Sequence, residues 1–133
     1  MSEEKVELAR QYFEAFNAKG LDGTEHLRHP DIEVFDPPDF PDAGRYVGEA
    51  AVRELVEGYM EMVWDGQFRD PEYLDAGDEI VVVWRMSGRS GHGGGLPVDV
   101  PFAHVLLFED GRVRRIRQYR SRAEGLEAAG LSE

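Results

Sequence analysis

Near the start of the chain lies the stretch Arg10-Gln11-Tyr12-Phe13-Glu14-Ala15-Phe16-Asn17-Ala18. Its apolar residues continue a spacing of three or four that begins at Val6 and Ala9, and this period is typical of an amphipathic α-helix. Acidic residues at positions 3 and 4 suit a first turn, and Lys19-Gly20 suits an end. We therefore expect a helix over residues 3–19, with aromatic side chains on its buried face.

Prolines divide the next part of the chain into short pieces. Residues 22–29 predict a second, short helix that Pro30 ends. Val34 and Phe35 predict a short strand, which Pro37-Pro38 terminates because proline cannot donate to a sheet ladder. A loop rich in proline and acidic residues is expected over residues 37–47.

The second half of the chain begins with a helix and continues as strands. Residues 49–64 carry an apolar stripe at helical spacing, and Asp65-Gly66 ends it. The chain is then strand-like as far as residue 121. The strands expected there run from Glu79 to Arg89, from Val98 to Phe108 and from Arg112 to Arg120, with a glycine-rich hairpin loop at residues 91–95. Ser121 and Glu124 have capping-box spacing for a short C-terminal helix that stops at Gly130.

Helices first and antiparallel strands afterwards indicate an α+β fold, with helices packed on one face of a curved sheet. The 133 residues fit a single domain over residues 1–133. A sheet that curls around helices in so small a domain can leave an apolar cavity open at one end. We therefore expect a hydrophobic small molecule as the ligand.

Composition and charge narrow the classes of partner. The net charge is −12, from 27 acidic against 15 basic residues, and such a surface repels nucleic acid and anionic membranes. We find no apolar signal segment and no run long enough to span a bilayer, so a soluble, cytoplasmic protein is expected. Cysteine is absent, which excludes disulfides and thiol catalysis.

Arginines are concentrated near the C-terminus, against the acidic trend. They are Arg112, Arg114, Arg115, Arg117, Arg120 and Arg122. In a strand they divide between two faces and form no single basic stripe. Surface ion pairing with the excess acids is one interpretation; the other is that Arg120 enters a pocket and binds an anionic group.

Tyr12 and Asp36 are the candidate catalytic residues. A phenol delivered by a helix and a carboxylate delivered by a strand end can act as hydrogen-bond donor and general base on one buried substrate. Each residue also has an ordinary structural interpretation. Asp36 precedes Pro37 and can initiate a turn, and Tyr12 can be a core aromatic whose hydroxyl finds a local partner.

Four segments resemble the nuclear transport factor 2-like superfamily, and within it the SnoaL-like and ketosteroid isomerase-like branches. They are residues 11–23 (Gln11 to Gly23), 29–34 (His29 to Val34), 46–53 (Tyr46 to Arg53) and 108–113 (Phe108 to Val113). The resemblance implies a cone-shaped, curved antiparallel sheet wrapped around N-terminal helices, the cystatin-like α+β barrel. It is specific for the fold, which hosts isomerases, cyclases, hydrolases, dehydratases and non-catalytic domains.

The resemblance also implies roles for particular residues. Ketosteroid isomerases use a tyrosine on the first helix, an aspartate before a proline and a second acid on a later strand. Tyr12 and Asp36 match the first two, whereas the third position falls on Ala103. The missing donor can cost roughly 10²–10³ in rate, so a steroid isomerase is not the expected activity.

Further residues are expected to line the cavity and bind substrate if the resemblance holds. They are Phe16, Leu55, Tyr59, Val82, Trp84, Met86, Ala103, Val105, Ile116, Gln118 and Arg120. Gln118 is the neutral amide that can donate to a substrate carbonyl or pair with Arg120 or Tyr12. The opposite face, including His104 and Tyr119, is expected to meet a second copy in a homodimer.

Three functions remain open at this point. The first is an isomerase or cyclase with no cofactor, in which Asp36 moves a proton next to the carbonyl of a hydrophobic substrate. The second is a non-catalytic binding module for a hydrophobic metabolite, and the third is a dimeric domain whose pocket is filled by Trp84 and Met86. No metal site is expected, because His26 and His29 lack a third ligand at a recognisable spacing.

Overall fold

A computed structural model of the chain describes residues 2–36, 44–90 and 95–131, apart from the side chains of residues 2, 59–66 and 90. The elements in chain order are α1 (Ser2–Lys19), the 3₁₀ helix η1 (Leu21–Leu27), β1 (Arg28–Asp36), β2 (Gly44–Val47), α2 (Glu49–Met62), β3 (Val63–Asp75), β4 (Glu79–Ser90), β5 (Pro97–Glu109), β6 (Arg112–Tyr119) and α3 (Arg122–Ala128). Most of the expected loop over residues 37–47, and the glycine loop at 91–94, lie outside the described residues.

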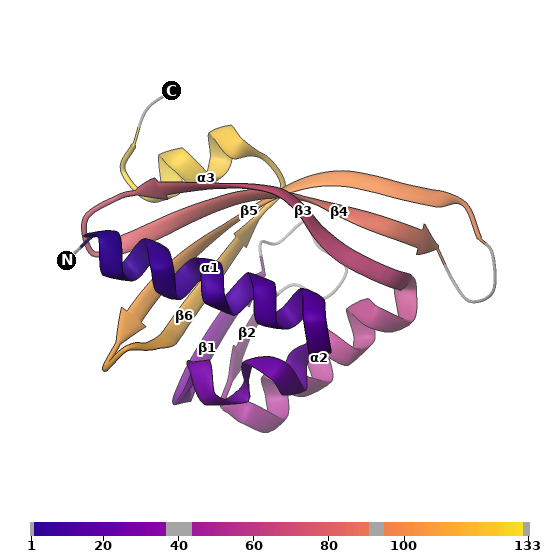
Figure 1. Ribbon diagram of the computed structural model, residues 1–133, viewed down its shortest axis with the longest axis horizontal. Coiled ribbons are helices and arrows are strands. Elements are labelled where there is room, and N and C mark those ends of the chain that lie inside the picture. Colours follow the sequence, from indigo (N-terminus) through magenta and orange to yellow (C-terminus); the bar gives the residue numbers. More distant parts are fainter. Residues whose placement is uncertain (1, 37–43, 91–94, 132–133) are drawn as a thin grey trace.

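The six strands form one curved, unclosed sheet in the order β2-β1-β6-β5-β4-β3. Helices α1 and α2 lie on one side of it and α3 lies on the other (Figure 1). This arrangement confirms the predicted α+β fold with its N-terminal helices. One feature corrects the expectation of a purely antiparallel sheet, because β1 and β6 pair in parallel while every other neighbouring pair is antiparallel.

The predicted helices over residues 3–19 and 49–64 correspond to α1 and α2. The cap of α3 is also as predicted: Ser121 Oγ accepts a hydrogen bond from the Glu124 backbone N–H at 3.1 Å. The helix predicted over residues 22–29 is wrong at its end, because β1 begins at Arg28 and continues through Pro30. Pro30 is tolerated there because the β1–β6 register is irregular between Arg28 and Glu33, where no ladder hydrogen bond needs its missing N–H.

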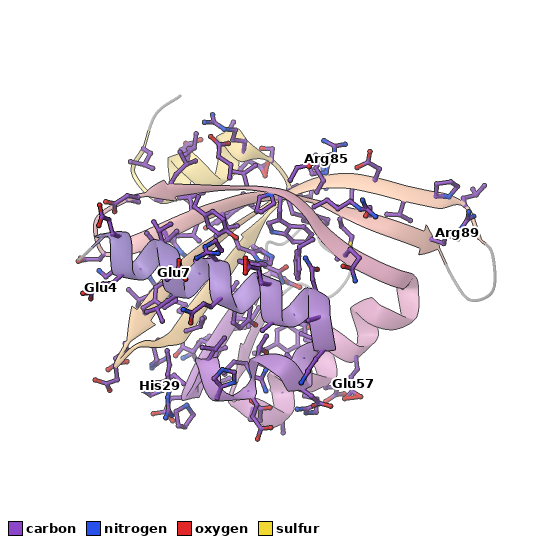
Figure 2. The ribbon with its side chains drawn as sticks, viewed as in Figure 1. Glu4, Glu7, His29, Glu57, Arg85 and Arg89 are labelled. Atoms are coloured by element: carbon purple, nitrogen blue, oxygen red, sulfur yellow. The ribbon has the colours of Figure 1, made fainter. Side chains whose placement is uncertain are left out.

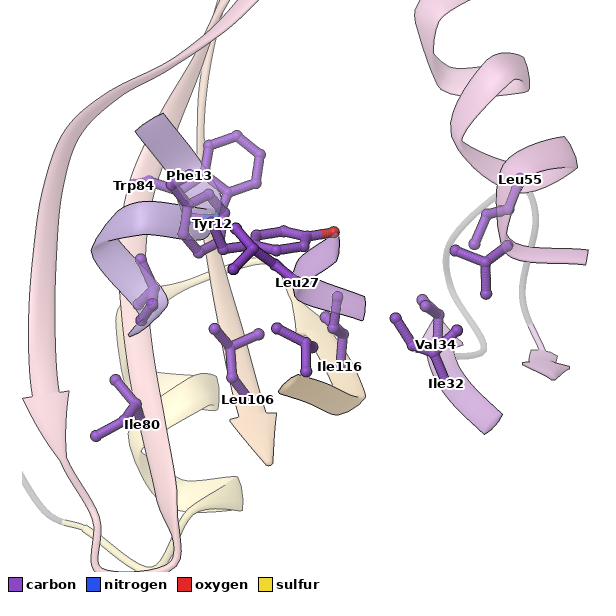
Figure 3. Close-up of a cluster of buried hydrophobic side chains, with 14 of the residues drawn as sticks. Tyr12, Phe13, Leu27, Ile32, Val34, Leu55, Ile80, Trp84, Leu106 and Ile116 are labelled. Carbon is purple, nitrogen blue, oxygen red and sulfur yellow. The ribbon is translucent and has the colours of Figure 1, made fainter. Parts of the chain in front are cut away.

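Strand β4 is buried on both faces along its centre. Ile80, Val82 and Trp84 face α1 and belong to the main core, which Figure 3 shows in close-up. Val81 faces the other way and packs with Val105 and Leu126 under α3. The sheet therefore separates an inner core, on the side of α1, from a smaller outer core, on the side of α3.

Many charged side chains lie at the periphery, as Figure 2 shows for Glu4 and Glu7 on α1 and for Arg85 and Arg89 on β4. Ion pairing accounts for most of the arginine run. The pairs are Arg114–Glu109 at 3.2 Å, Arg115–Glu79 at 3.1 Å, Arg117–Glu79 at 3.0 Å and Arg122–Glu72 at 3.1 Å. Among the helices of the described residues, none combines the length and apolar character that crossing a membrane requires.

Candidate functional site

A cavity of about 90 Å³ lies between α1, α2 and the inner face of the sheet. Its wall is mostly apolar and aromatic. The lining residues are Tyr12, Phe16, Val34, Val52, Leu55, Val56, Phe68, Trp84, Met86, Phe102, His104, Ile116 and Gln118. The volume exceeds the roughly 10–15 Å³ that one water needs, so the inner core is hollow at this point.

Aromatic rings build the wall on the β3–β4–β5 side. The Phe68 and Trp84 rings meet edge to face with centroids 4.1 Å apart, and Phe102 stacks on Trp84 at 5.2 Å. Phe16 reaches Phe68 from α1 with centroids 4.9 Å apart. Because these rings fix one another, the wall has a defined shape.

A polar chain of three side chains lies at one end of the cavity. The Gln118 amide Nε2 donates to the Asp36 carboxylate, and Gln118 Oε1 lies 2.8 Å from His104 Nε2. The strand register explains why these three side chains lie together. Gln118 on β6 pairs directly with His104 on β5, and β6 is also the neighbour of β1, which ends at Asp36. Asp36 is only 6% exposed and is not among the residues that line the cavity, but the hydrogen bond from Gln118 links it to the lining.

His104 is a neutral imidazole at pH 7. Its burial lowers the pKa to about 4, and the hydrogen bond to Gln118 opposes that shift without cancelling it. The Gln118 amide nitrogen is directed to Asp36, so its oxygen faces His104 and must accept. His104 therefore carries its proton on Nε2, and Nδ1 keeps a lone pair.

The Tyr12 hydroxyl belongs to a second buried polar group. Burial raises the pKa of the Tyr12 phenol, while the positive charge of Arg28 and a hydrogen bond with Thr24 act in the opposite direction. Arg28 is itself buried, with Nε 3.0 Å from a Glu49 carboxylate oxygen and Nη1 2.7 Å from the Leu21 carbonyl oxygen. The phenol stays protonated and available as a donor.

Most of the residues predicted for the cavity do meet there. Tyr12, Phe16, Leu55, Trp84, Met86, Ile116 and Gln118 all line it. Val82 lies in the same inner core without touching the cavity. The side chain of Tyr59 lies outside the described residues. Whether any of these residues binds a ligand stays a prediction.

The predicted facing of β5 was wrong by one residue. Val82 pairs with His104 and Val83 with Ala103, so Ala103 and Val105 lie on the outer face, beside α3. Phe102 and His104 are the β5 residues that line the cavity, so the prediction that His104 lies on the outer face is wrong. Arg120 is exposed and is not part of the lining, which corrects the idea that it enters the pocket.

Six lining residues are absent from the predicted set: Val34, Val52, Val56, Phe68, Phe102 and His104. The signal for Phe102 was available in principle, because a hairpin that pairs Trp84 with residue 102 places both side chains on one face. Phe68 was missed because β3 was not separated from the other strands. The expected dimer contact on the outer face of the sheet stays a prediction.

One group of possible metal ligands is present away from the cavity. His29, at the start of β1, lies beside Glu109 and Asp110 at the β5–β6 turn. Glu109 is also 3.2 Å from Arg114, which neutralises it. Because the acids are exposed and one is already paired, this cluster is a surface ion network.

The curved sheet around two helices defines the cystatin-like, nuclear transport factor 2-like fold. Residues 9–116 match the SnoaL-like domain family, and the chain belongs to that family. No curated protein matches the chain.

Solved structures agree on the fold. A protein of unknown function with a cystatin-like fold from Xanthomonas campestris is 20% identical, with a TM-score of 0.75, over 97% of this chain and 98% of that one. A SnoaL-like polyketide cyclase, described as putative, from Jannaschia sp. CCS1 is 20% identical, with a TM-score of 0.74, over 89% and 85%. A hypothetical protein with a ketosteroid isomerase-like fold from Catenulispora acidiphila DSM 44928, in complex with trimethylamine, is 18% identical, with a TM-score of 0.71, over 94% and 93%.

Proposed function

We propose that the cavity binds a small, largely apolar carbonyl compound and that the chain moves a proton next to its carbonyl group without a cofactor. The observation that carries this proposal is the hydrogen-bonded chain from Asp36 through Gln118 to the cavity wall. An amide that donates to a carboxylate fixes its orientation, and an oriented carboxylate is a group that can take a proton from a substrate. Asp36 is the general base in this scheme.

Tyr12 is the donor to the oxygen of the developing enolate. The phenol lines the cavity, and burial keeps it protonated by raising its pKa. The Arg28 charge beside it strengthens a donor of this kind, because it favours negative charge on the phenol oxygen. The apolar wall around Tyr12 excludes water and so strengthens the interaction of its hydroxyl with the substrate.

The volume of the cavity limits the size of the substrate. Pockets for drug-sized ligands measure roughly 300–1,000 Å³, whereas this cavity measures about 90 Å³. We therefore infer a substrate built on a single ring and not a steroid.

Deuterium exchange tests the reaction directly. Cyclohexanone in deuterated buffer loses its α-proton NMR signals as exchange proceeds, and the wild-type chain should accelerate that loss. Asp36→Asn should reduce the acceleration by about 10²-fold or more, since a positioned base contributes roughly that factor. Asp99→Asn is the matched control, because Asp99 lies exposed on the far part of β5 and pairs with Arg85 at 2.7 Å. Equal acceleration by wild type and Asp36→Asn would contradict the assignment of the base.

A non-catalytic binding module is the second candidate, and one observation favours it. The two groups that would do the chemistry already have protein partners, Tyr12 with Thr24 and Asp36 with Gln118. In that case cyclohexanone binds, shown by saturable chemical-shift changes of the lining residues, while its exchange rate stays at the buffer value. If no single-ring probe binds at all, the cavity is effectively filled and the third candidate stands.

A further inference from the structure

Two nitrogen atoms on the cavity wall are buried without a partner. Among the described residues, four buried side-chain nitrogens lack a hydrogen bond: Trp84 Nε1, His104 Nδ1, Arg115 Nε and Arg117 Nε. The two arginines bond Glu79 through their other nitrogens. Trp84 and His104 line the cavity and are only 3% and 7% exposed, so an unpaired nitrogen on either is costly unless a ligand or water fills it.

These two atoms have opposite hydrogen-bonding roles. The indole Nε1–H of Trp84 can only donate. His104 Nδ1 can only accept, because Gln118 Oε1 holds the proton on Nε2. The two rings are neighbours, with centroids 5.0 Å apart and planes at 72°. Two neighbouring rings of the cavity wall therefore carry one unpaired donor and one unpaired acceptor.

We propose that the cavity recognises a neutral hydroxyl group on a single ring, a phenol or an enol, whose oxygen accepts from Trp84 Nε1 and whose hydrogen is donated to His104 Nδ1. This inference rests on the proposed function, since it names the ligand class for the same cavity. An enol is the tautomer that proton transfer next to a carbonyl produces, and a phenol is its stable aromatic counterpart. A hydroxyl group satisfies both unpaired nitrogens with one oxygen atom.

Other functional groups satisfy the pair less well. A ketone or an ether accepts from the indole and leaves His104 Nδ1 unpaired. A carboxylate meets the lone pair of a neutral imidazole and buries a charge without a counter-ion. An ammonium group donates to His104 but faces the indole N–H, which cannot accept from it. The pair thus selects for a hydroxyl group over groups of similar size.

Three probes of nearly equal size separate these cases: phenol, anisole and toluene. Phenol offers both a donor and an acceptor, anisole only an acceptor, and toluene neither. Chemical-shift titration of the full chain should give phenol an affinity about tenfold above anisole or more, because one buried hydrogen bond to a neutral group is worth roughly that factor. Anisole should in turn exceed toluene.

Variants assign each preference to one atom. Trp84→Phe removes the donor, so anisole and toluene should bind alike. His104→Leu removes the acceptor, so phenol should fall to the level of anisole while the ratio of anisole to toluene is kept. Ratios within one variant cancel general losses of affinity that come from an altered cavity shape.

A measurement on the wild type guards against variants that fail to fold. The Trp84 indole N–H resonance, distinguished from that of Trp64 by Trp64→Phe, should move downfield with phenol and anisole and not with toluene.

Equal binding of all three probes would overturn hydroxyl recognition and leave the proposed function standing. A phenol preference that survives both variants would overturn the assignment to Trp84 and His104. Absence of binding by every probe would overturn both the inference and the proposed function, whereas loss of exchange in Asp36→Asn concerns the reaction alone.

Discussion

The two faces of the central strands are built from alternating residues of one sequence, yet they differ in packing. On the outer face, Val81, Val105 and Leu126 form a core with no exposure above 2%, and α3 lies so close that a Cβ atom on Gly125 would be 2.6 Å from the Ala103 Cβ. The inner face encloses a cavity of about 90 Å³ and two unpaired nitrogens.

This difference separates the part of the molecule that stabilises the fold from the part that is available for a ligand. Protein interiors are normally packed as densely as organic crystals, and buried polar atoms are normally paired. The outer core obeys the packing rule, although Arg115 Nε and Arg117 Nε on that face are also unpaired, whereas the inner core violates both rules at one place. Local violations of this kind are expected where a fold carries a functional site.

The largest expected effect comes from truncating one leucine in each core. Leu126→Ala should lower the free energy of unfolding by about 3–5 kcal/mol, because it empties a filled site. Leu55→Ala should cost about 2 kcal/mol, since Leu55 already borders empty space and loses fewer contacts. Urea unfolding monitored by circular dichroism measures both values.

The size of the ligand that the cavity accepts should also differ between the Leu55→Ala and Leu126→Ala variants. Leu55→Ala should allow the cavity to take a two-ring probe such as 2-naphthol, whereas Leu126→Ala should leave probe size unchanged. Equal destabilisation by both variants, with no change in the size of probe accepted, would show that the inner core is packed as tightly as the outer one.

The second prediction concerns His104, an imidazole buried in the inner core. The pKa of His104 is about 4 in the folded chain, below the ordinary value of 6.5. As pH falls through 6.5 the unfolded chain binds this proton while the folded chain does not, so stability present above pH 6.5 is lost towards pH 4. The loss is roughly 3 kcal/mol in total, of which about 2 kcal/mol falls between pH 7 and pH 5.

Comparison with His104→Gln isolates this contribution. The difference in the free energy of unfolding between wild type and variant, measured by urea unfolding, should change by about 2 kcal/mol between pH 7 and pH 5. The contributions of the carboxylates cancel in this difference, because both chains contain them. His26→Asn, at an exposed position in η1, controls for removing one imidazole. A wild-type-minus-variant difference that is independent of pH would mean that His104 is not desolvated.

The same comparison explains what the sequence could predict. The spacing of Val6, Ala9, Tyr12 and Phe16 is compatible with only one structure, a helix with one buried face. Helix α1 is as expected. For strand β5 the sequence leaves open which face points to the inner core. Burial is compatible with both faces, one of which carries Phe102, His104 and Leu106 and the other Ala103 and Val105. With both faces covered, alternation of apolar and polar residues no longer marks the inside.

The candidate site was predictable where it rests on helix faces and strand ends. Tyr12 faces the cavity because its helix can bury only one side, and Asp36 is at the end of β1. The contacts from Gln118 to Asp36 and His104 were not predictable, because they depend on the register of three strands. A shift of one residue in any strand moves a side chain from one core to the other.

The smallest expected effect tests the close approach of α3 to the outer face. Gly125→Ala gains helix propensity, yet the new methyl group meets the Ala103 Cβ on a sheet that cannot yield. We expect a net loss of about 1–2 kcal/mol, with partial recovery in the double variant Gly125→Ala, Ala103→Gly. Gly58→Ala in α2 is the control, because its Cβ would meet nothing within 4 Å, and it should stabilise the chain by about 0.4–1 kcal/mol. Stabilisation by both alanine substitutions would mean that α3 is loosely held, and the contrast between a filled outer face and a hollow inner face would lose its basis.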